Sequence, residues 1–146
     1  MKRWLIYIAL LAAALAFPKQ PVELGKLIPV ELIMVERLDG QYRIRTDTGD
    51  AGQGATLETA IQNLHDNASG HLFLDTAQYL LLMEETRDAI PAISSLLKGN
   101  TRVCLVKYDT KLDDLARYLS AHPPQVRLKD LKIGEKPEYL QQIETK

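Results

Sequence analysis

The chain has 146 residues, 46% of them hydrophobic and 25% charged, with a formal net charge of −1. This length and composition suit one domain with its own hydrophobic core, and they exclude a disordered chain or a coiled coil. The near-neutral charge gives no basic field, so we expect no nucleic-acid partner. Cys104 is the only cysteine. Because it lies in an apolar run, we expect a buried thiol, and no intramolecular disulfide is possible.

The N-terminus has the pattern of a secretory signal peptide. Lys2 and Arg3 precede an apolar run over residues 4–17, which is shorter than the roughly 20 residues of a membrane-spanning helix. Ala-Leu-Ala at 14–16 then matches a cleavage site. We expect residues 1–16 to be a signal peptide or, if uncleaved, an N-terminal anchor. The protein would then be extracytoplasmic, either secreted or tethered to the outer face of the cytoplasmic membrane.

The rest of the chain divides into three parts. Residues 17–27 predict a linker and lead-in, residues 28–133 a single domain, and residues 134–146 a C-terminal tail. Within the domain, residues 28–36 predict a strand with apolar residues on both faces, which is typical of a central strand. Asp39-Gly40 predicts a two-residue hairpin turn. Residues 42–46 alternate between apolar and charged side chains, which predicts an edge strand protected by its arginines.

The next segment, residues 47–55, combines two aspartates with three glycines and predicts a connecting loop. A glycine-rich loop before a helix can hold phosphate on its backbone N–H groups, but the aspartates would repel an anion and no Walker-type lysine is present. Carboxylates can also bind calcium, although the EF-hand spacing is not met. The candidate residues for a ligand or partner are Asp47, Asp50, Gly52 and Gly54. We expect no metal site, no catalytic residue and no cofactor.

Helices and strands alternate after this loop. Thr56 predicts the N-cap of a helix whose apolar residues keep helical spacing as far as Ala68. Residues 79–83 and 102–108 predict buried strands, separated by a helix over about residues 88–98 that Asp88 caps. A third helix is expected after Thr110. The order β-β-α-β-α-β-α predicts an α/β fold on the border of α+β, with a mixed four-stranded sheet in spatial order 2-1-3-4 and helices packed on it.

Three runs of the chain resemble the N-terminal domain of the Ger(x)C spore-germination proteins. They are ELGKLIPVELIMVERLDGQYRIRTDTGD, GATLETAIQNLHDNASGHLFLDTAQYLLLMEE and NTRVCLVKYDTKLDDLARYL, which together cover most of residues 22–131. The resemblance implies an extracytoplasmic, non-enzymatic component of a germinant-receptor complex in spore-forming bacteria. Two features differ from the family. Phe17-Pro18 stands where Ger(x)C proteins have a lipidated cysteine, and those proteins continue into further domains, of which this sequence contains the first. The shared motifs are core residues and turns, so no catalytic residue carries over.

We expect a non-enzymatic interaction module, and the resemblance implies a role in sporulation or germination. Its expected partner is another protein at the membrane or cell envelope, and the sequence does not indicate an oligomeric state. Two alternatives remain open. One is a sensor that binds a small ligand or a cation through the glycine-rich loop, and the other is a hydrolase that uses Asp47, Asp50, His71 or Asp75.

Overall fold

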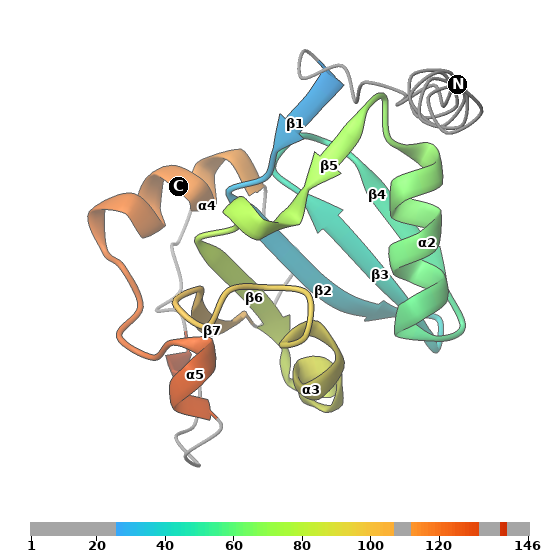
Figure 1. Ribbon diagram of the computed structural model, residues 1–146. Helices are drawn as coiled ribbons and strands as arrows, with labels where there is room; N and C mark the ends of the chain where they lie inside the picture. Colours follow the sequence, from blue (N-terminus) through green and yellow to red (C-terminus); the bar gives the residue numbers. More distant parts are fainter. Residues whose placement is uncertain (1–25, 107–111, 132–137, 140–146) are drawn as a thin grey trace, which may run out of the picture.

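The computed structural model describes residues 26–106, 112–131 and 138–139 (Figure 1). The strands are β1 (Leu27–Pro29), β2 (Leu32–Leu38), β3 (Gln41–Thr46), β4 (Ala51–Gly54), β5 (His71–Phe73), β6 (Tyr79–Met83), β7 (Arg102–Val106) and β8 (Glu138–Tyr139). The α-helices are α2 (Leu57–Asn67), α3 (Ile90–Ile93), α4 (Leu112–Ala121) and α5 (Leu128–Leu131), and the 3₁₀-helices are η2 (Leu74–Thr76) and η3 (Glu84–Ala89).

The predicted α/β class is confirmed. The main sheet has the order β4-β3-β2-β6-β7, which the two-residue strand β8 extends, and β1 and β5 form a separate parallel pair. Its four central strands follow the predicted spatial order. β3 is antiparallel to β2, whereas β6 and β7 are parallel to it. The hairpin turn is also as predicted, because Asp39 and Gly40 have φ angles of 50° and 78°.

Helices pack on both faces of the sheet (Figure 1). Ile33 and Val35 of β2 point to the face that carries α2, α3 and α5, whereas Leu32 and Met34 point to the face that carries α4. Each face therefore has its own apolar core, and β2 is a central strand buried on both sides. Cys104 is buried in the core beneath α4, as predicted.

The helix α2 follows its predicted pattern. The Thr56 hydroxyl accepts a hydrogen bond from the Thr59 N–H at 3.2 Å, which satisfies a donor in the first turn. Leu57, Ala60 and Leu64 are the buried residues of the helix. Their spacing places them on one face of the helix, and that face packs on β3 and β4.

Strand β4 corrects two predictions. Residues 51–54 were expected in a loop but form a strand antiparallel to β3, so β3 is not the edge strand. The glycines in this segment suggest a loop because they lack side chains, yet here they let α2 approach the sheet. At the new edge, the Asn63 side-chain amide donates a hydrogen bond to the Gln53 carbonyl at 2.6 Å.

Two further predictions change in their bounds. The first strand is divided, because residues 27–29 pair with β5 and the chain enters the main sheet only at Leu32. The helix expected over residues 88–98 is α3 alone, preceded by η3. Asp88 does not cap it. After Ile93 the chain continues in turns, in which the hydroxyls of Ser94 and Ser95 donate to carbonyl groups three residues earlier.

Several predictions concern residues outside the described ranges. The signal peptide (1–16), nearly all of the lead-in (17–27) and the start of the third helix at Thr110 belong to this group. Of the expected tail, only β8 is described, and it pairs with β7. No helix in the described part of the chain has the length and apolar character needed to cross a membrane.

Candidate functional site

The two aspartates singled out in the sequence lie in the turn between β3 and β4. The Asp47 carboxylate accepts hydrogen bonds from the backbone N–H groups of Glu31 and Leu32 at 3.2–3.3 Å. Asp47 thereby binds the backbone where the chain enters β2. The Asp50 carboxylate accepts a hydrogen bond from the Thr48 hydroxyl at 2.7 Å. Both carboxylates therefore have local structural partners.

Gly52 and Gly54 contact α2 rather than the aspartates. A Cβ atom on Gly52 would overlap the Ala60 carbonyl oxygen and the backbone of Leu64, and a Cβ on Gly54 would lie 2.7 Å from the Ala60 nitrogen. Only glycine leaves room for α2 to pack directly on β4 at these two positions. The requirement for glycine here is structural, and the four candidate residues do not form one cluster.

A polar cleft nevertheless adjoins the aspartates. Asp47 and Asp50 line it together with Arg43, Arg45 and Leu112. Both arginines are held by the buried carboxylate of Glu36, whose Oε1 lies 3.3 Å from Arg43 Nη1 and 3.3 Å from Arg45 Nε. Of the four candidate residues, Asp47 and Asp50 therefore share a cleft of mixed charge, whereas Gly52 and Gly54 do not line it.

The residues of the hydrolase hypothesis are distributed over different surfaces. Asp47 and Asp50 line the cleft just described, whereas Asp75 lines another cleft beside Lys98. The ring of His71 stacks on that of His65, with 6.2 Å between the centroids. Within the described ranges, no group of three or more His, Cys, Asp or Glu side chains is placed to hold a metal ion.

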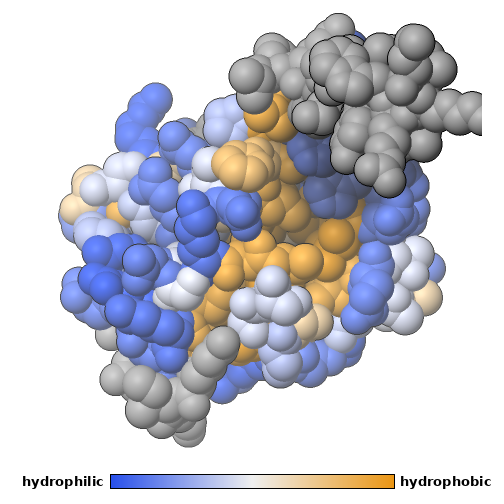
Figure 2. All heavy atoms as spheres, viewed as in Figure 1, coloured by the Kyte–Doolittle hydropathy of each residue, from blue (hydrophilic) through white to orange (hydrophobic). Residues whose placement is uncertain are grey.

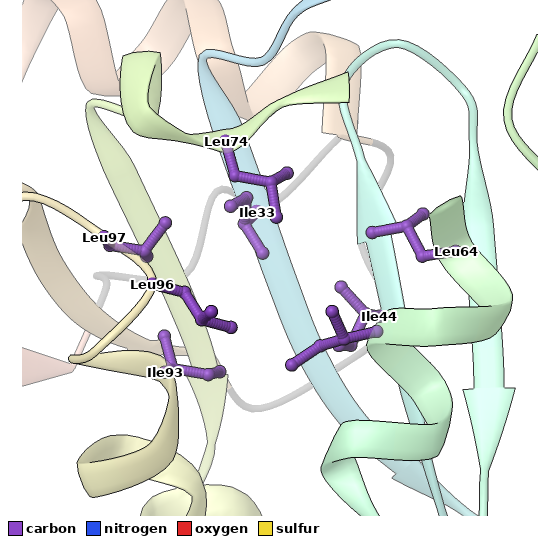
Figure 3. A pocket seen from close by; sticks show the side chains of 8 residues that line it. Ile33, Ile44, Leu64, Leu74, Ile93, Leu96 and Leu97 are labelled. Carbon is purple, nitrogen blue, oxygen red and sulfur yellow. The ribbon is translucent and has the colours of Figure 1, made fainter. Parts of the chain in front are cut away.

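The most distinctive surface is an apolar groove that the sequence did not predict. Figure 2 shows it as a continuous hydrophobic band between hydrophilic borders. It is a shallow groove with a volume of about 20 Å³, and its lining exposes apolar atoms only. The residues that line it, most of which point into it in Figure 3, are Ile33, Ile44, Ile61, Leu64, Leu74, Ile93, Leu96 and Leu97.

The groove exists because α3 is short. Side chains from α2 and β3 form one wall, and those of α3 and the following turns form the other, with β2 as the floor (Figure 3). Since α3 ends at Ile93, no regular helix extends along the second wall. Leu96 remains 39% exposed. The sequence carries no signal of this exposure, because Leu96 lies three residues after Ile93, at a spacing that also fits a buried helical stripe.

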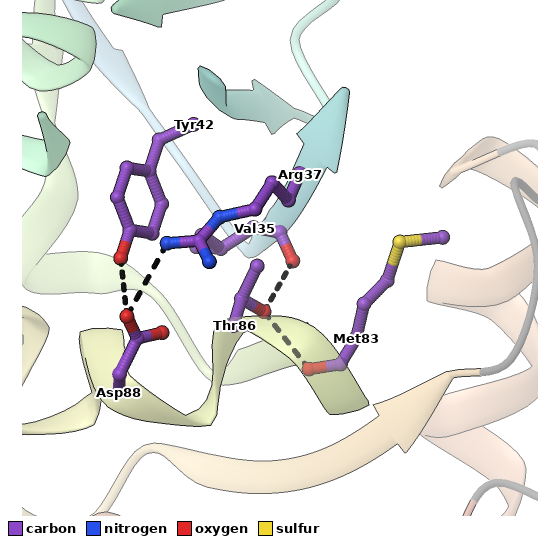
Figure 4. A network of polar contacts seen from close by, with 6 residues as sticks. All are labelled: Val35, Arg37, Tyr42, Met83, Thr86 and Asp88. Atoms are coloured by element: carbon purple, nitrogen blue, oxygen red, sulfur yellow. Dashed lines mark hydrogen bonds and ion pairs between the residues drawn. The ribbon is translucent and has the colours of Figure 1, made fainter. Parts of the chain in front are cut away.

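A polar network fixes η3, which precedes α3, to the β2–β3 hairpin (Figure 4). The Tyr42 hydroxyl donates to the Asp88 carboxylate at 2.5 Å, and Arg37 Nη2 lies 3.3 Å from the same oxygen. The Arg37 guanidinium also lies 4.5 Å from the centre of the Tyr42 ring. Nearby, the buried Thr86 hydroxyl bonds the carbonyls of Val35 and Met83. These contacts hold the position from which α3 starts.

The same network shifts two pKa values in opposite directions. The hydrogen bond from Tyr42 is the largest effect and lowers the pKa of the Asp88 carboxyl. Burial opposes it, and the Arg37 charge lowers the pKa further. The hydrogen bond to Asp88 raises the pKa of Tyr42, and burial and the Asp88 charge add to it. The neutral phenol and the ionised carboxylate are therefore the paired forms.

Comparison of the chain with protein-family models, with curated proteins and with solved structures finds no match. The interpretation of the groove and the clefts therefore depends on their own geometry.

Proposed function

We propose that this protein is an extracytoplasmic, non-enzymatic interaction module that binds another protein of the membrane or cell envelope through the apolar groove. The observation that carries this proposal is the groove itself. Its lining presents only apolar atoms to solvent, and Leu96 stands partly exposed on its wall. Continuous apolar surface on a soluble domain is typical of binding sites.

Two features of the sequence support the location and the process. The signal-peptide pattern of residues 1–16 favours export. The resemblance of residues 22–131 to the Ger(x)C N-terminal domain favours a role in spore germination or sporulation. Exposed apolar side chains such as Leu96 and Phe73, which is 42% exposed, suit a surface that a partner covers.

The test replaces Leu96 with glutamate in the native host. A charge at this position must be desolvated when a partner covers the groove, so we expect Leu96→Glu to abolish chemical crosslinking to the partner at the envelope. The matched control is Leu38→Glu. Leu38 is also an exposed leucine, at 44%, but it ends β2 and does not line the groove.

The proposal predicts that wild type and Leu38→Glu give the same crosslinked species and the same sporulation and germination rates. Leu96→Glu should lose the species and slow at least one of these rates, while its circular dichroism spectrum remains unchanged. If Leu96→Glu retains the crosslinked species and both rates, the groove is not the binding surface.

A further inference from the structure

Four basic residues form a cluster at one end of the main sheet. Arg102 begins β7 and forms an isolated antiparallel bridge with Arg127, so the two side chains lie on the same side of the backbone pair. The Lys129 N–H donates a hydrogen bond to the Gly99 carbonyl at 3.0 Å. The backbone of Lys129 therefore lies beside the turn that contains Lys98. We call Lys98, Arg102, Arg127 and Lys129 the basic corner.

No carboxylate within the described ranges forms an ion pair with these four side chains. The ion pairs of this part of the chain involve other arginines, among them Arg37, Arg43 and Arg87. Two acids lie close in the structure. Asp75 lines the same cleft as Lys98 and Arg102, and Asp130 accepts the Arg127 N–H. Among the described residues, the four basic side chains and these two acids together carry a net charge of +2.

The basic corner adjoins the apolar groove. Leu74 lines the groove and the next residue, Asp75, lines the cleft of the basic corner. In the same way, Leu96 and Leu97 line the groove and Lys98 lines the cleft. The two depressions therefore share the wall made by η2 and the turns after α3. A ligand long enough to leave the groove at this end meets positive charge.

The lining of the groove also restricts the backbone of its occupant. It exposes no polar atom, so it offers no partner for a backbone N–H or C=O group. An extended peptide would bury such groups without hydrogen bonds, at a cost of about 1–3 kcal/mol each. A helix satisfies its own backbone and presents apolar side chains at a spacing of three to four residues.

We propose that the groove binds an amphipathic helix of the partner protein, with its apolar stripe in the groove and carboxylate side chains at one end facing the basic corner. This inference rests on the proposed function and adds the chemistry of the partner. Charge complementarity with the basic corner selects acidic helices, while the groove supplies contact area.

The test uses synthetic helical peptides of about 18 residues with one leucine stripe and three versions of the terminal turn. One version carries glutamates, one glutamines and one lysines. Each version is made twice, with this turn at the N-terminus and with it at the C-terminus, so that both orientations of the helix in the groove are tested. We expect the purified chain to bind a glutamate version about 5- to 30-fold more tightly than the matching lysine version. Most of this difference should disappear at about 1 M salt.

Exposed-site variants separate the two surfaces. Lys98→Glu combined with Lys129→Glu should remove or invert the preference for glutamate, whereas Arg117→Glu on α4 should leave it unchanged. Leu96→Glu should weaken all versions. Equal affinity for acidic and basic peptides in the wild type would overturn the inference, while leaving the groove's role in the proposed function to the crosslinking test. Binding to phosphatidylglycerol vesicles that acidic peptides do not displace would overturn it in favour of a lipid surface.

Discussion

At the scale of single residues, the segment from Asp47 to Gly54 shows how one composition serves different structural needs. Asp47 accepts hydrogen bonds from two backbone N–H groups where the chain enters β2, whereas Gly49 takes a positive φ of 88° in the turn. Gly52 and Gly54 have ordinary φ angles and are required by contact with α2. The glycines by themselves predict a loop. Their contact with α2 is a tertiary contact with a helix later in the chain, and the local sequence does not show it.

Gly52→Ala should therefore be among the most damaging small substitutions. A methyl group at this position overlaps the backbone of α2, which cannot move aside as a side chain would. We expect a loss of about 3 kcal/mol or more in the free energy of unfolding, measured with denaturant. Gly99→Ala is the control, because its added Cβ would lie 3.4 Å from the Lys129 Cβ and should change stability by less than about 0.5 kcal/mol. Similar losses for both variants would show that α2 does not lie against β4 as described.

At the scale of elements, the contact between the hairpin and η3 depends on side chains that the sequence assigned to other roles. Asp88 was expected to cap a helix, because an aspartate before an apolar helical pattern commonly does so. In the structure its carboxylate instead accepts from Tyr42, 46 residues earlier in the chain. The local sequence pattern correctly predicts that Thr56 caps its helix. It does not predict the role of Asp88, because the partner of Asp88 is distant in sequence.

Tyr42→Phe tests this contact through its pH dependence. The pKa of Asp88 is lowered by folding, so its contribution is present above its ordinary pKa of 3.8 and is lost as pH falls through the lowered value. The pKa of Tyr42 is raised, so its contribution is present below 10.0 and is lost as pH rises through the raised value. Because Asp88 is 57% exposed, we expect a loss of at most about 1 kcal/mol at neutral pH.

The measurement is the unfolding free energy of wild type and Tyr42→Phe at neutral pH and near pH 2. The difference between the two proteins should shrink towards the acid end, as Asp88 takes up a proton in the folded state. A difference that is the same at both pH values would mean that the phenol hydroxyl stabilises the fold by another route.

At the scale of the whole molecule, the sheet has two apolar faces that are closed by different helices. The four consecutive apolar residues 32–35 predict a strand that is buried on both faces. The hairpin, followed by alternating helices and strands, predicts the order of the four central strands. The groove was not predictable in this way. The groove depends on the residue at which α3 ends and on the distance between α2 and α3. Neither of these produces a periodic pattern in the sequence. Leu96 shows this, since its spacing from Ile93 fits a helical stripe, yet its side chain is 39% exposed on the wall of the groove.

The two faces should contribute comparably to stability. Leu64 of α2 and Leu119 of α4 are both fully buried, on opposite sides of the sheet. We expect Leu64→Ala and Leu119→Ala each to cost about 2–5 kcal/mol, because each leaves a cavity against the strands. Thermal unfolding followed by circular dichroism should show a single transition for both variants. A second transition in either one would indicate that the face concerned unfolds independently.

The hydrogen bond from Asn63 to the Gln53 carbonyl has a consequence for how new partners can arise. A backbone edge accepts almost any extended chain, because main-chain groups are the same in every protein. Asn63 occupies one of the carbonyl groups at this edge, so an added strand has fewer free groups to pair with, and the recognition that we propose uses side chains instead. Under the proposed function, substitutions at groove positions such as Leu96 would change the partner over evolutionary time while the strands, their register and the glycines beneath α2 stay unaltered.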